Sequence, residues 1–133
     1  MLVNVTPNNE KAKSILKMVN TSLEMIREIN LAKFPSNVAK EYYDVIRELI
    51  SIVLLLDGLK AVGEGAHMQQ IEYLAENYRE FGRVEIELFE DLRAIRNKIA
   101  YDGFFVKVDY IERKSQDISR VIGKLREIVG RKL

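Results

Sequence analysis

The fold expected for this chain is decided by one stretch, V-E-I-E-L-F-E-D-L-R-A-I-R-N-K-I-A-Y-D-G at residues 84–103. Its apolar side chains recur at the spacing of one helix face: Leu88, Leu92, Ile95 and Ile99. Phe89 widens that face, which predicts a helix that is anchored in a core. Gly103 should end the helix, because glycine readily adopts the left-handed conformation that stops one.

A second face of the same predicted helix carries polar groups. At about 100° per residue, Arg93, Asn97 and Tyr101 share this face, and Arg96 lies between it and the core side. Two guanidinium groups, an amide and a phenol at a helix end are suited to binding an anion such as phosphate. The same spacing also fits a solvated surface or the seam between two subunits, so these alternatives stay open.

Residues 96–101, R-N-K-I-A-Y, resemble the signature of the HEPN family, small all-α proteins with an R-N-x-x-x-H motif near the end of a long helix. The flanking D-L-R-A-I-R and the order of the expected helices also match the family. Two positions depart from it. Tyr101 stands where the family usually has its histidine, and Gly103 stands where some toxin members carry a tyrosine. The resemblance therefore implies a family-like scaffold with an altered site.

In the family, the histidine and the arginine are implicated in metal-independent RNA cleavage, in which the ribose 2′-hydroxyl attacks the adjacent phosphate. The resemblance thus implies a catalytic set of Arg96, Asn97 and Tyr101. It also implies binding of RNA or another anion by Arg93, Arg96 and Lys98. Arg96 offers a planar guanidinium that matches phosphate oxygens, and Asn97 can fix its orientation.

Tyr101 is the weak member of this set. The reference pKa of tyrosine is about 10 and that of histidine about 6.5, a difference worth on the order of 5 kcal/mol if the phenol must act as a base near neutral pH. A phenol is better suited to donating a proton or to stacking on a nucleobase. Tyr101 is therefore expected in one of these two roles.

His67, the only histidine, is a candidate accessory residue. Its register with Ile71 and Leu74 predicts a partly buried ring whose nitrogens bond to backbone groups. The alternative is that His67 faces the Arg96 cleft of a folded dimer and replaces the missing imidazole.

Glu48 is a second accessory candidate, because it lies within an otherwise apolar segment. It can pair with Arg96 or Arg93 across the bundle and orient the guanidinium. It can equally be a surface residue paired with Arg47 or Ser51, and the sequence leaves both interpretations open.

Length and composition favour a single globular domain, residues 1–133. Hydrophobic residues make up 47% of the chain and charged residues 31%, as is typical of a soluble globular protein. The net charge is only +1, so any binding of a polyanion must rest on a local patch.

Several classes of site are excluded. The absence of cysteine rules out a disulfide, a thiolate metal site and a cysteine nucleophile, and it fits the cytoplasmic location that we expect. No metal-ligand spacing and no glycine-rich phosphate loop is visible, so we expect no metal and no cofactor. We also expect no membrane span, because the longest apolar run, residues 49–56, is much shorter than the roughly 20 residues that cross a bilayer.

The periodicity predicts an all-α, up-and-down antiparallel bundle of about five helices with no sheet. We expect these helices at about residues 7–32, 38–62, 66–77, 84–103 and from 109 onward. The expected N-caps are Thr6 for the first helix and Ser36 or Asn37 for the second. Asp109 and Glu112 suggest a capping box for the last.

Residues 49–56, L-I-S-I-V-L-L-L, are apolar nearly all round a helix. Such a helix is either wrapped by other helices or lies at a subunit interface. Because one bundle of this length has few buried positions to spare, we expect a homodimer in which two motif helices form a shared cleft.

The resemblance leaves two functions. One is a non-catalytic helical binding partner, for example of a separately encoded minimal nucleotidyltransferase in a toxin–antitoxin-like pair. The alternative is a metal-independent ribonuclease or RNA-binding toxin that uses Arg96 and Tyr101. We favour the first, because the histidine and the following tyrosine of the toxin-like members are both replaced here.

Overall fold

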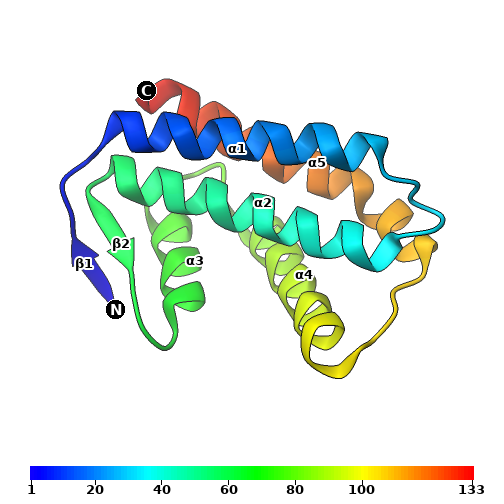
Figure 1. The fold of residues 1–133 in the computed structure, drawn as a ribbon. Helices are drawn as coiled ribbons and strands as arrows, with labels where there is room; N and C mark the ends of the chain where they lie inside the picture. Colours follow the sequence, from blue (N-terminus) through cyan, green and yellow to red (C-terminus); the bar gives the residue numbers. More distant parts are fainter.

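Helix α2 (Pro35–Leu56) is the most apolar helix and lies at the centre of the molecule. A computed structural model describes all 133 residues and contains five helices and two short strands. α1 (Asn9–Glu28), α4 (Arg83–Asp102) and α5 (Val108–Lys132) pack against α2 (Figure 1). The predicted all-α bundle of five helices is confirmed. None of these helices combines the length and the apolar character needed to cross a membrane.

The apolar run at residues 49–56 is covered within one chain. Its fully buried members are Leu49, Ile50, Ile52, Val53 and Leu54. They belong to one continuous core to which α1, α4 and α5 also contribute. The reason given above for a homodimer was therefore wrong, because one copy of the chain already covers this helix.

The second helix ends earlier than predicted, and a small sheet follows it. Gly58 takes the left-handed conformation, with φ +79°, directly after α2. The chain then forms β2 (Leu59–Ala61), which pairs antiparallel with β1 (Leu2–Asn4). The prediction of helix to residue 62 and of no sheet was wrong here, because three-residue strands are too short to show an alternating pattern.

The helix caps also differ from those predicted. Asn8, not Thr6, caps α1, and its side-chain oxygen accepts a hydrogen bond from the Lys11 amide at 3.0 Å. Neither Ser36 nor Asn37 caps α2, which begins at Pro35. α5 begins without the capping box predicted from Asp109 and Glu112.

Ser36 has a tertiary role instead. It is buried, and its hydroxyl accepts a hydrogen bond from the Val106 amide at 2.8 Å. This bond fixes the segment between α4 and α5 to the start of α2. The predicted helix at 66–77 is confirmed as α3 (Ala66–Asn77), and Gly103 ends α4 with φ +63°.

Asp57 joins the end of α2 to α3 and α5. Its carboxylate accepts hydrogen bonds from the hydroxyls of Tyr73 at 2.6 Å and Tyr78 at 2.5 Å, and it pairs with the Lys132 ammonium. Burial alone would raise the pKa of Asp57, but the hydrogen bonds from Lys132, Tyr73 and Tyr78 outweigh it and lower the pKa. Burial and the bond to Asp57 raise the pKa of both tyrosines.

Asp57→Asn should lower the free energy of unfolding by about 2 kcal/mol near neutral pH, because hydrogen bonds to charged groups contribute about 1.5–3 kcal/mol. The folded-state pKa lies below the ordinary 3.8, so this contribution is present above 3.8 and is lost as pH falls through the folded value. Urea unfolding of both proteins across this pH range measures the effect.

The control is Asp102→Asn, because Asp102 is exposed and forms no ion pair. It should change the free energy by no more than about 0.5 kcal/mol. Equal effects of the two substitutions would contradict a structural role for Asp57.

Candidate anion-binding site

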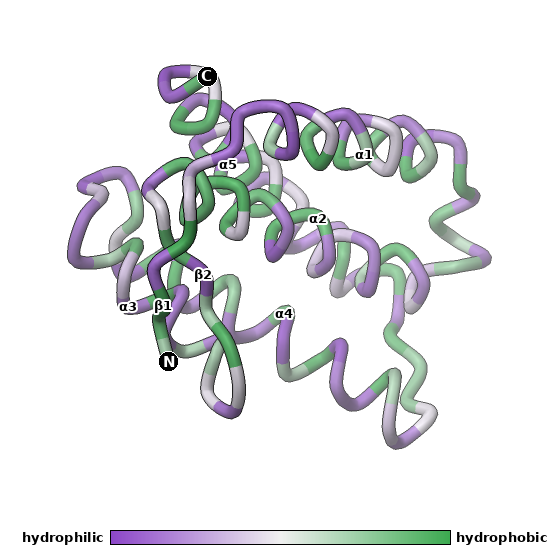
Figure 2. The backbone as a smooth tube through the Cα atoms, turned by 60° about the vertical axis from the view of Figure 1, so that its left-hand side comes forward, coloured by the Kyte–Doolittle hydropathy of each residue, from purple (hydrophilic) through white to green (hydrophobic).

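The C-terminal half of α4 projects from the bundle. All four buried residues of this helix lie in its first half: Glu85, Leu88, Phe89 and Leu92. Figures 1 and 2 both show α4 separating from α2 toward its C-terminal end. Ile95 and Ile99 are only half-buried. The residues that resemble the family motif therefore lie on a helix segment that the core does not enclose.

Arg96 lies at the point where α4 leaves the core. Its guanidinium is 5.8 Å from the centre of the Tyr43 ring, and its Nη1 donates to the Asn97 side-chain oxygen at 3.4 Å. The Nε of Arg96 is buried and has no hydrogen-bond partner. Neither Arg96 nor Arg93 forms an ion pair. These two guanidinium groups thus keep their charge uncompensated.

His67 lies in the same region, in a stack of three rings. Its ring centre is 4.7 Å from that of Phe89 and 6.3 Å from that of Tyr43, and Tyr43 and Phe89 are 5.2 Å apart. His67 and Arg96 therefore pack against the same Tyr43 ring, within one chain. Burial raises the pKa of Tyr43, although Arg47, Arg93 and Arg96 act to lower it.

Both nitrogens of His67 are engaged. Nε2 is 2.7 Å from a carboxylate oxygen of Glu90, and Nδ1 is 3.4 Å from the hydroxyl of Tyr43. Burial, with a smaller contribution from Arg93, lowers the pKa of His67, whereas Glu90 raises it. The neutral ring then donates from Nε2 to Glu90 and accepts from Tyr43. The prediction that backbone groups bond to the His67 nitrogens was wrong, because the side chains of Glu90 and Tyr43 are their partners.

Glu90 is a residue that the sequence analysis missed, and Glu48 is one that it over-weighted. Glu48 forms no ion pair with Arg93, Arg96 or Arg47. Ser51, its other predicted partner, binds the Arg47 carbonyl and Gln70 instead. Glu90 could have been found from its spacing, because it precedes Arg93 by three residues and Asn97 by seven and so shares their helix face.

The structure separates Tyr101 and Lys98 from this cluster. The Tyr101 side chain is 75% exposed and forms no hydrogen bond. Lys98 is also exposed, and its ammonium lies 5.8 Å from the centre of the Phe104 ring. Phe104 and Phe105 are 45% and 84% exposed, and among residues 104–108 only Val106 is buried. The projecting end of α4 and the segment that follows it therefore carry three exposed aromatic side chains.

These side chains can bind an anion but do not form a metal site. Nowhere in the chain do three His, Cys, Asp or Glu side chains gather as metal ligands would. Arg93, Arg96 and Asn97 present donors on one face, next to a histidine whose side chain is only 10% exposed. The arrangement supplies positive charge and orientation, and it lacks an accessible group that could take up a proton near neutral pH.

Glu90→Gln should lower the pKa of His67 further below 6.5, because it removes the negative charge that stabilises the protonated ring. The pKa is measured by NMR, by following the imidazole proton signal during a pH titration. Because His67 is the only histidine, this signal needs no further assignment. The matched control is Glu87→Gln, because Glu87 is exposed and pairs with Arg83. This substitution should leave the pKa of His67 unchanged. An unchanged or higher pKa in Glu90→Gln would refute the His67–Glu90 bond.

Comparison with family models, with curated proteins and with solved structures finds no match for this chain. The resemblance to the HEPN family thus rests on residues 96–101, their flanks and the order of the helices, and it stays a prediction. A function for this chain must be inferred from its own side chains.

Proposed function

We propose that this chain is a HEPN-type helical protein that acts as a non-catalytic binding partner through the projecting end of α4. The observation that carries the proposal is the exposure of Tyr101 near the end of α4 and of Phe104 and Phe105 directly after it. Clustered apolar side chains of this kind mark interaction sites, and aromatic residues supply much of the binding energy at interfaces.

The site favours binding over catalysis for a chemical reason. General-base catalysis near neutral pH needs an accessible group with a suitable pKa. Tyr101 is accessible, but the reference pKa of a phenol is about 10. His67 has a suitable reference pKa, but its ring is almost enclosed and both nitrogens are bonded to Glu90 and Tyr43. Neither residue is placed to act as the base.

The surface formed by the end of α4 and the residues after it also indicates what kind of partner it would bind. An apolar end next to the unpaired Arg93 and Arg96 suits a partner surface that is apolar with acidic groups at its rim. A second copy packed through the ends of α4 would bring two such arginine clusters to one cleft. The family resemblance adds a minimal nucleotidyltransferase as the class of heterologous partner.

We expect such a second copy to bind, so that the chain is a homodimer in solution. Phe105→Ser should dissociate this expected homodimer, because loss of a buried aromatic anchor costs about 2 kcal/mol or more of binding energy. Light scattering at micromolar concentration should give a dimer mass for the wild type and a monomer mass for the variant. Met18→Ser is the control, since Met18 is equally apolar, 60% exposed and on α1. A monomeric wild type, or equal dissociation by both variants, would overturn the dimer.

The heterologous partner is tested separately. The first step is to read the neighbouring genes for a minimal nucleotidyltransferase. The chain is then co-expressed with that protein, and the complex is recovered on an affinity tag. Recovery that depends on Phe105 supports the proposal, and no recovery removes this partner class.

One specific observation favours RNA binding as the second candidate: the uncompensated guanidinium of Arg96 with its partnerless Nε. Arg96→Ala should weaken RNA binding by about tenfold, because a hydrogen bond to a charged group contributes about 1.5–3 kcal/mol and 1.4 kcal/mol corresponds to tenfold. Lys98→Ala, which removes an exposed charge on another face, should weaken it by less than about threefold. Fluorescence anisotropy with a labelled RNA gives both values, and equal losses would indicate diffuse charge only.

A separate experiment distinguishes RNA binding from RNA cleavage. RNA is incubated with the wild-type protein in the presence of a metal chelator, and its length is then examined on a gel. The proposal expects no cleavage. Cleavage that is lost in both Arg96→Ala and Tyr101→Phe would establish the metal-independent ribonuclease in place of the non-catalytic partner.

A further inference from the structure

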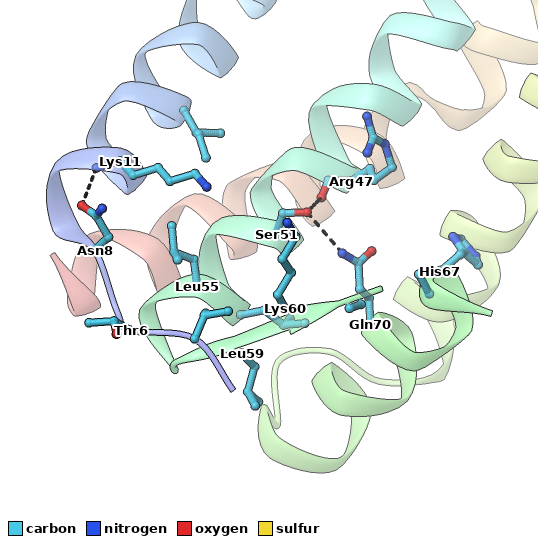
Figure 3. A pocket seen from close by; sticks show the side chains of 15 residues that line it. Thr6, Asn8, Lys11, Arg47, Ser51, Leu55, Leu59, Lys60, His67 and Gln70 are labelled. Carbon is cyan, nitrogen blue, oxygen red and sulfur yellow. Dashed lines mark hydrogen bonds between the residues drawn. The ribbon is translucent and has the colours of Figure 1, made fainter. Parts of the chain in front are cut away.

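A cavity of about 480 Å³ lies at the other end of α2, between the first turn of α1, β2 and the start of α3 (Figure 3). Its volume falls in the range of small-molecule sites, roughly 300–1,000 Å³. Arg93, Arg96 and Asn97 do not line it, and His67 is the one residue that it shares with the cluster on α4. The cavity is therefore a second site, independent of the function proposed above.

The charged groups of this cavity are all positive. Lys11, Arg47 and Lys60 line it, and no aspartate or glutamate does. None of these three cations forms an ion pair anywhere in the chain. Figure 3 shows the side chains of Lys11 and Lys60 extending from α1 and β2 into the space beside α2. The N-terminal turns of α1 and α3 add partial positive charge, so the cavity attracts an anion.

Ser51, Gln70 and His67, three of the neutral polar residues of the cavity, already form hydrogen bonds within the protein. The Ser51 hydroxyl donates to the Arg47 carbonyl at 3.1 Å and accepts from the Gln70 amide at 3.2 Å. His67 directs its two nitrogens to Glu90 and Tyr43. The three cations are free of ion pairs and can hold the polar head of a ligand.

The rest of the lining is aliphatic. Ile15, Leu54, Leu55 and Leu59 contribute apolar surface, and His67 is the only ring. Without a free aromatic face to stack a nucleobase, and without a carboxylate to bind ribose hydroxyls, the cavity is poorly suited to a nucleotide. An alkyl chain matches this lining, because its burial removes apolar surface from water.

We propose that this cavity binds an aliphatic phosphate monoester, with the phosphate held by Lys11 and Lys60 and the alkyl chain against the leucines of α2. Arg47 adds positive charge at the edge of the cavity. A phosphate monoester carries a charge of about −1.5 to −2 near neutral pH, which suits three cations with no opposing carboxylate. Charge-assisted hydrogen bonds from the two ammonium groups to phosphate oxygens hold the head.

Calorimetry with three probes tests the two halves of the proposal: octyl phosphate, octanol and inorganic phosphate. Octyl phosphate should bind at least about tenfold more tightly than either of the others, since each lacks one of the two matched parts. Equal binding of inorganic phosphate would overturn the aliphatic part, and equal binding of octanol would overturn the anionic part. No binding of octyl phosphate would overturn both.

Binding measurements on matched lysine variants test whether the ligand lies in this cavity. Lys11→Gln and Lys60→Gln should each weaken octyl phosphate binding by about tenfold. Lys17→Gln removes the same charge from α1 outside this cavity and should leave the affinity unchanged. Amide signals that move on titration should belong to the start of α1, the end of α2, β2 and α3. Movement confined to α4 around Arg93 and Arg96, or unchanged affinity in both lysine variants, would overturn the assignment.

Discussion

The burial of α2 on nearly all sides is the constraint on which the rest of the structure depends. The second half of α2 is apolar nearly all round and must be covered on most of its faces, and α1, α4, α5 and β2 each cover part of the helix. The fully buried apolar residues of α4, Leu88, Phe89 and Leu92, all lie in the first half of that helix. The second half contributes only the partly buried Ile95 and Ile99 to the core, and it is this half that carries Arg96, Asn97 and Tyr101.

Nearly balanced total charge conceals two positive regions. The net charge is +1, yet Arg93 and Arg96 on α4, and Lys11, Arg47 and Lys60 around the cavity, lack ionic partners. Glu90 bonds to His67 beside Arg93, and the other paired carboxylates lie elsewhere, with other basic residues of the same chain. Local placement, rather than composition, therefore determines where this protein can attract an anion.

Local patterns explain most of what the sequence predicted. The bounds of α3 and the end of α4 at Gly103 follow from periodicity and from the backbone freedom of glycine, which neighbouring residues alone determine. Ser36 looked like a cap because its type is common at helix starts, but its actual partner, Val106, is 70 residues away.

In the candidate site, too, some features follow from local spacing and others depend on contacts between distant residues. Helical spacing alone predicts that Arg93, Asn97 and Tyr101 share one face of α4, with Arg96 between that face and the core side. Glu90 bonds to His67 across 23 residues, and this pair requires the packing of α3 on α4. Long-range pairs of this kind depend on how helices meet, which no pattern within a single helix encodes.

The pairing of α2 with α5 also sets the order in which the chain can fold. Ser36 of α2 bonds to Val106, which lies just before α5, and Asp57, which lies just after α2, pairs with Lys132 of α5. These two contacts span 70 and 75 residues. α1 and α2 are neighbours in the sequence and can associate early, but one face of α2 stays open until α5 closes over it. Closing so long a loop is entropically costly and slow. Until then the most apolar surface of the protein is exposed to other chains, so α5 protects the folding molecule from aggregation as well as completing its core.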